Sequence, residues 1–112
     1  MNPIKTLFVV LLFTSSCASN DSSESISCGT VEISFAADVM PIVTASCATD
    51  SDCHAAGSKE GPGALTTYSQ VHAARTDIAS TVSSGSMPKD ASLTATERNN
   101  IVCWIRNGAL DN

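Results

Sequence analysis

Five cysteines constrain the fold of this 112-residue chain more than any other feature. They stand at positions 17, 28, 47, 53 and 103. Small domains that cannot build a large apolar core are commonly stapled by disulfides, metals or other covalent links. The bonds that these five sulfurs make therefore decide both the fold and the function.

The N-terminus has the features of an export signal. Lys5 precedes an apolar run over residues 7–13, which is too short to span a bilayer as a helix. Small residues then lead to Cys17, as at a bacterial lipoprotein cleavage site, so we expect residues 1–16 to be removed and Cys17 to be lipidated. Cleavage near Ala18 and retention of the segment as an anchor are the alternatives. We expect an exported lipoprotein, in the periplasm or on the outer membrane or cell surface.

The remaining chain is predicted to hold one domain behind a short tether. Residues 17–27 are rich in Ser and poor in apolar side chains, which is typical of a flexible linker. The domain, residues 28–112, contains only three aromatic rings, those of Phe35, Tyr68 and Trp104. Apolar burial is worth ~25 cal/mol per Å² against a large chain entropy, so we expect a staple or a cofactor to complete this core.

Cys47, Cys53 and His54 form the pattern Cys-x5-Cys-His. Two thiols followed directly by His is the pattern by which a c-type haem is attached, with the thiols bonded to the vinyl groups and the His bound to iron. The usual pattern has two residues between the thiols, whereas this chain has five, Ala48–Asp52. These residues are small, polar and prone to turns, so we expect them to bulge outward without separating the sulfurs.

Met87 is the candidate for a second axial ligand. It lies in the Gly-Ser-Met-Pro loop over residues 85–88, after His54 in the chain. A Met sulfur is a common sixth ligand of haem iron and raises the reduction potential. The alternative is an ordinary packing role for Met87. We expect Met40 in the core and His72 at the surface.

Cys28 and Cys103 remain if Cys17 is lipidated and Cys47 and Cys53 hold haem. In an exported protein such a pair is expected to form a disulfide. A rival interpretation makes Cys47–Cys53 a second disulfide, without haem. Another is a soft-metal carrier that binds Cu(I) through Cys, His and Met, but it requires the thiols to stay reduced outside the cytosol.

Local signals predict an all-α domain. A first helix is expected from Val39 to Ser46, with Asp38 as its N-cap and Pro41 in its first turn. Only Thr30–Ser34 has any strand character.

Three further helices are expected, and each is marked by its ends. Thr67 or Ser69 caps a helix that continues to Ala74, and another helix covers Asp77–Val82 and ends near Gly85. Thr94 and Glu97 form a capping box for the last helix, which ends at Asn107 and Gly108. We expect Trp104 in this helix to pack against the first one.

The order of these features resembles the small monohaem c-type cytochrome domains of exported bacterial proteins, over about Ile33 to Asn112. The matching segments are residues 39–43, the two thiols with His, and residues 65–68, 85–88, 93–97 and 104–109. The resemblance implies a cytochrome c-like fold of three to five short helices around one covalent haem c. It also implies that Cys47 and Cys53 are the thioether sites, with His54 and Met87 as the axial ligands.

The expected function is electron transfer with redox proteins as partners. Loss of the signal would remove Lys5 and no acid, which leaves five Lys and Arg against eleven Asp and Glu, so nucleic-acid binding is disfavoured. No catalytic motif or small-molecule substrate is evident, and we expect a carrier rather than an enzyme, alone or within an oxidoreductase complex. The alternative is a haem-free, disulfide-stabilised lipoprotein module without enzymatic activity.

Overall fold

A computed structural model describes residues 25–112 of the chain. The expected signal peptide at residues 1–16, the lipidation site Cys17 and most of the tether lie outside the described residues. Within residues 25–112, no helix is long and apolar enough to cross a membrane.

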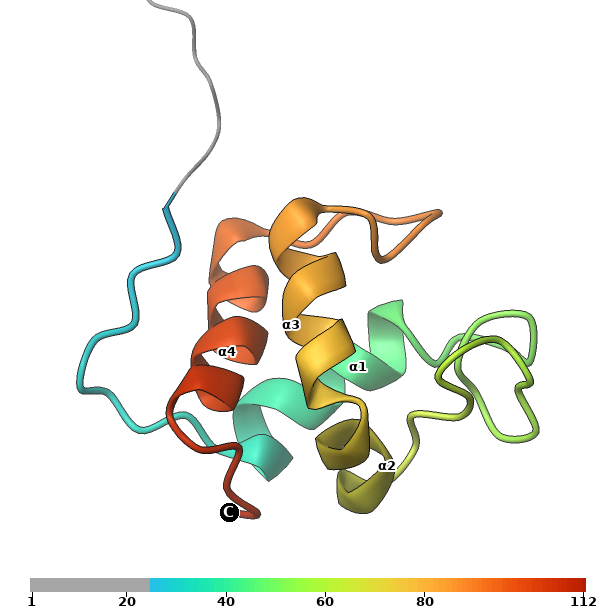
Figure 1. Cartoon of the computed structure of the whole chain (residues 1–112), viewed down its shortest axis with the longest axis horizontal. Coiled ribbons are helices and arrows are strands. Elements are labelled where there is room, and N and C mark those ends of the chain that lie inside the picture. Colours follow the sequence, from blue (N-terminus) through green and yellow to red (C-terminus); the bar gives the residue numbers. More distant parts are fainter. Residues whose placement is uncertain (1–24) are drawn as a thin grey trace, which may run out of the picture.

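All regular secondary structure in this part of the chain is helical, which confirms the all-α prediction. A π-helical turn, η1 (Phe35–Val39), runs into α1 (Met40–Ser46) and is followed by α2 (Tyr68–Ala73), α3 (Arg75–Ser84) and α4 (Ala95–Arg106). In Figure 1, α3 and α4 lie side by side, and the helices packed against α4 are α3 and η1. Long loops follow α1 and α3, and both extend from the same end of the domain (Figure 1).

The first helical segment begins four residues before its predicted start. Ser34, and not Asp38, is its N-cap: the Ser34 hydroxyl accepts a hydrogen bond from the Ala37 amide at 3.1 Å. Asp38 instead lies in the first turn, where its carboxylate accepts the Ser34 amide at 2.9 Å. The N–H of Phe35 donates to the side chain of Asn112 at 2.9 Å, so a contact 77 residues away fixes this start. Residues 30–34 form no strand.

Most of the other helix ends agree with the sequence signals, but α3 begins at Arg75, two residues before the expected Asp77, and has no side-chain cap. Thr67 caps α2 in a capping box with Gln70, and Thr94 caps α4 in a capping box with Glu97. Gly85 ends α3 in the left-handed conformation, with φ of 77°, which a residue without a Cβ adopts at little cost.

The three aromatic rings of the domain form one cluster. Phe35 lies 5.1 Å from Tyr68 and 5.1 Å from Trp104 between ring centroids, and Trp104 is 1% exposed. This arrangement confirms Trp104 as a packing residue against the first helical segment. The Tyr68 hydroxyl and the Trp104 indole donate to the carbonyls of Ala109 and Leu110, both at 2.8 Å. All three of these rings lie in helices, and none lies in the loops that follow α1 and α3.

Cys28 and Cys103 form the predicted disulfide. Their sulfurs are bonded at 2.02 Å and their Cα atoms are 5.2 Å apart, across a sequence separation of 75 residues. Cys103 is buried in α4, whereas Cys28 lies in the irregular segment before η1. The bridge therefore ties the start of the domain to its last helix.

Candidate functional site

The segment from Cys47 to His54 is closed by a backbone hydrogen bond. Cys47 follows α1, and its amide donates to the Val43 carbonyl at 2.9 Å. The last turn of that helix therefore sets the position of the Cys47 thiol. The amide of His54 donates to the Cys47 carbonyl at 3.0 Å. In an α-helix this contact joins residues four apart. Here the same hydrogen bond joins residues seven apart, so it reproduces across the longer segment the contact that a Cys-x2-Cys-His segment makes in a helix.

The His54 ring is held in one orientation and one tautomer. The side chain is 8% exposed, and its Nδ1 lies 2.9 Å from the carbonyl oxygen of Gly63. A carbonyl only accepts, so Nδ1 carries a proton, and in the neutral ring the lone pair is then on Nε2. Metal-bound imidazoles are commonly held in this way, through a hydrogen bond from the nitrogen that does not bind the metal. The amide of Leu65 also donates to the His54 carbonyl at 2.8 Å, which fixes the backbone.

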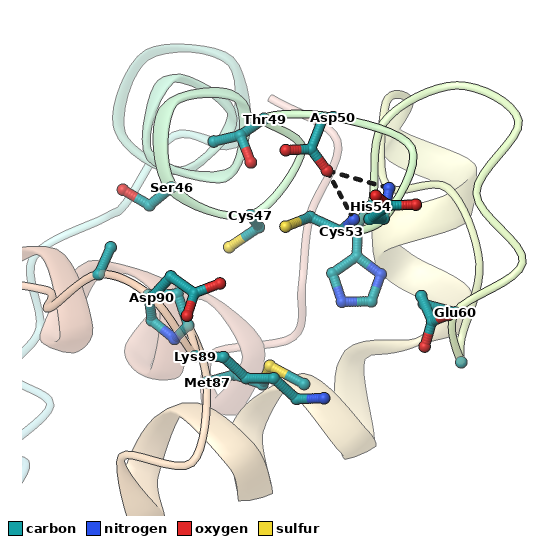
Figure 2. Close-up of a pocket in the computed structure, with 14 residues that line it drawn as sticks. Ser46, Cys47, Thr49, Asp50, Cys53, His54, Glu60, Met87, Lys89 and Asp90 are labelled. Atoms are coloured by element: carbon teal, nitrogen blue, oxygen red, sulfur yellow. Dashed lines mark hydrogen bonds between the residues drawn. The ribbon is translucent and has the colours of Figure 1, made fainter.

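Met87 reaches the same site from the loop between α3 and α4. Its amide donates to the Thr81 carbonyl at 3.2 Å, which ties the loop to the last turns of α3. The side chain is half-buried. Figure 2 shows the Met87 sulfur below the loop that carries Cys47, Cys53 and His54, on the side toward which the His54 ring points.

Two cavities of about 320 Å³ each meet at these side chains. Cys47, His54, Gly61 and Met87 line both of them, and Cys53 lines the outer one. The inner cavity is lined largely by aliphatic side chains of the core, Val43, Leu65, Ile78, Val82 and Ile101, with Asp77, Ser80 and Thr81 of α3 also in its wall. The site thus offers two thiols, a buried imidazole with an available Nε2 and a thioether around an apolar hollow, and this donor set fits a covalently attached haem.

The mouth of the outer cavity is acidic. Asp50, Asp52, Glu60 and Asp90 line it together with a single cation, Lys89. These acids are scattered in the sequence, and the folding of two loops brings them together. The site therefore combines an apolar interior with a negatively charged rim.

Cys47 and Cys53 carry free thiols, not a disulfide. Burial raises the pKa of the Cys47 thiol, and the neighbouring Cys53 raises it further. Since the thiolate is the nucleophile, a raised pKa keeps Cys47 largely protonated and slow to react at neutral pH.

Alkylation of the haem-free protein tests this pKa. At about pH 8, iodoacetamide is expected to modify Cys47 several-fold more slowly than the same thiol in urea, because less thiolate is present in the folded state. Peptide mapping by mass spectrometry gives the rate at each position. Equal rates for Cys47 in the folded and unfolded protein would contradict the raised pKa.

The structure brings all four predicted site residues, Cys47, Cys53, His54 and Met87, to one place. Met40 packs against the core as expected, and the His72 ring lies 5.3 Å from Tyr68, outside both cavities. The role of Gly63 could not be predicted, because a backbone acceptor has no sequence signal, and neither could the particular role of Asp50 among residues 48–52. Among residues 25–112, no three His, Cys, Asp or Glu side chains are grouped so as to hold a metal ion by themselves.

Comparisons of the chain with protein-family models, with curated proteins and with solved structures gave no match.

Proposed function

We propose that this chain is an exported electron carrier with one covalently attached haem c in a cytochrome c-like fold. Cys47 and Cys53 would form the thioether bonds to the haem, and His54 and Met87 would bind its iron. The proposal rests on the resemblance in sequence order and on the site into which the helical fold gathers these side chains.

One observation carries the proposal. Met87 is separated from His54 by a long loop, α2 and α3, yet both line the same two cavities as Cys47. The Gly63 carbonyl fixes the tautomer that leaves Nε2 of His54 available as a ligand. A buried His with one ring nitrogen engaged, a thioether and two free thiols around the same cavity would supply the donors that a haem c needs.

This arrangement favours electron transfer over substrate chemistry. The bound group would supply one-electron exchange between Fe(III) and Fe(II). The protein would hold both axial positions with His54 and Met87, which leaves no position open for a substrate or peroxide. The aliphatic side chains of the inner cavity would contact the apolar face of the bound group, and thioether ligation would raise the reduction potential.

Export and membrane attachment are part of the same proposal. The N-terminal signal and Cys17 would place the domain outside the cytoplasm on a lipid anchor. Residues 17–27 would act as a tether that lets the domain meet redox proteins at the membrane surface.

The absorption spectrum tests the proposed function. The protein is exported in a bacterial host that matures c-type cytochromes, then purified and reduced with dithionite. We expect a red protein whose visible bands sharpen on reduction and return on oxidation. A colourless protein from such a host would contradict the proposal and favour the haem-free, disulfide-stabilised module.

A further inference from the structure

With five residues between the two thiols, the position of the second thiol must be fixed by contacts within the loop. Cys47 is fixed by α1, but Cys53 follows residues 48–52, which lie outside any helix. The hydrogen bond from the His54 amide to the Cys47 carbonyl brings the ends of this loop together, but it does not determine the path of the residues between them.

Asp50 organises the path of the loop. Its Oδ1 accepts hydrogen bonds from the amides of Asp52 and Cys53, both at 3.0 Å (Figure 2). Its carbonyl accepts the amides of Cys53 at 3.2 Å and Ala55 at 2.9 Å. One residue therefore receives four hydrogen bonds from the three residues Asp52, Cys53 and Ala55. The hydroxyl of Ser58 donates to the Cys53 carbonyl, so the peptide groups on both sides of the Cys53 Cα are held.

We propose that Asp50 is a positioning residue that places the Cys53 thiol for attachment of the second vinyl group. The inference rests on the proposed function and deepens it. Asp50 lies at the exposed rim and acts through the backbone of Cys53. An aspartate at this position in the turn can accept the amide of Cys53 while the bulge points outward.

Attachment requires this placement because each sulfur must meet its own vinyl carbon. In the reaction, a thiol adds across a vinyl double bond: sulfur bonds to one carbon, the thiol proton ends on the other, and the π bond is lost. No oxidant or reductant is consumed. The position of the Cys47 thiol is set by the last turn of α1 and not by Asp50, so loss of the Asp50 contacts should affect the second bond selectively.

The test compares four substitutions in the full-length exported protein. Asp50→Ala is expected to lower the ratio of doubly to singly attached haem about tenfold, the scale of one or two lost side-chain hydrogen bonds. Singly attached protein should carry its haem on Cys47. Asp50→Asn keeps an oxygen acceptor of the same reach and should restore the wild-type ratio. Asp50→Glu keeps the charge but displaces the acceptor, so it should resemble Asp50→Ala.

Asp52→Ala is the matched control, because Asp52 has the same charge, lies in the same loop and accepts no side-chain hydrogen bond there. Peptide mapping shows which cysteine carries the haem. The pyridine haemochrome spectrum shows how many bonds formed, because its band moves to longer wavelength when one vinyl group remains conjugated. In the haem-free protein, hydrogen exchange of the backbone amides at positions 52 and 53 should be about tenfold faster in Asp50→Ala than in wild type. In Asp52→Ala it should be unchanged.

The outcomes separate the two proposals. Wild-type protein without haem contradicts the proposed function and, with it, the role of Asp50. Wild-type and Asp50→Ala proteins with equal double attachment leave the proposed function intact and overturn the positioning role. A result in which Asp50→Glu matches wild type and Asp50→Asn does not would assign the effect to charge, which also overturns it.

Discussion

Replacing Cys28 and Cys103 together by alanine is expected to lower the free energy of unfolding by about 4 kcal/mol. The bridge spans 75 residues, so its removal frees the unfolded chain from a long loop closure. The folded state also loses a covalent tie between the irregular segment before η1 and the buried face of α4. Alanine is chosen because Cys103 is 3% exposed, and a serine hydroxyl there would need a hydrogen-bond partner.

Urea denaturation followed by circular dichroism measures this loss. The wild-type protein and the double variant are compared with the same haem content, since a bound group would itself stabilise the folded state. The variant should unfold at a clearly lower urea concentration. A loss below about 1 kcal/mol would contradict this expectation, because it would mean that the disulfide does not restrict the conformations of the unfolded chain.

Replacing Met87 by leucine is expected to lower the reduction potential by roughly 0.2 V, within the range of about 0.8 V that axial ligands cover. Leucine keeps an apolar side chain of similar size but removes the sulfur that would bind the iron. Thioether ligation favours the reduced state, so its loss should shift the equilibrium toward Fe(III). Spectroscopic redox titration of the purified protein gives the potential.

Met40→Leu is the matched control for this experiment. Met40 packs against the core at the start of α1 and lines neither cavity. The same chemical change at this position should leave the potential within a few hundredths of a volt, since it alters no ligand. A Met87→Leu potential that equals that of Met40→Leu would exclude Met87 as an axial ligand.

The helix ends could be predicted wherever the signal is local. The side chains of Thr94 and Glu97 each accept the backbone amide of the other, within one turn of helix. Gly85 ends α3 because glycine adopts the left-handed conformation easily. Both signals therefore lie in residues that are close in the sequence. The start of the first helical segment has a local part as well, since Ser34 and Asp38 cap it through contacts three and four residues long. It also depends on Asn112, which meets Ser34 and Phe35 only after the chain has folded, and that part has no local signal.

The same distinction applies to the site. Cys47, Cys53 and His54 are close neighbours in the chain, so their pattern can be recognised from the sequence alone. The contact from Gly63 to His54 depends on how the loop after His54 returns, and the acidic rim depends on two loops that meet in space. The composition of residues 48–52 indicates a turn, but the four hydrogen bonds received by Asp50 depend on the path that this turn takes in the folded chain.

The mass of the intact denatured protein tests the central claim most directly. Wild type and a Cys47→Ala/Cys53→Ala variant are exported in the same maturation-competent host, so N-terminal processing and the Cys28–Cys103 disulfide cancel in the comparison. The wild-type protein should exceed the variant by the mass of one haem, beyond the difference in side chains, and this extra mass should survive acid and organic solvent. A wild-type mass that differs from the variant by the two side chains alone would contradict it.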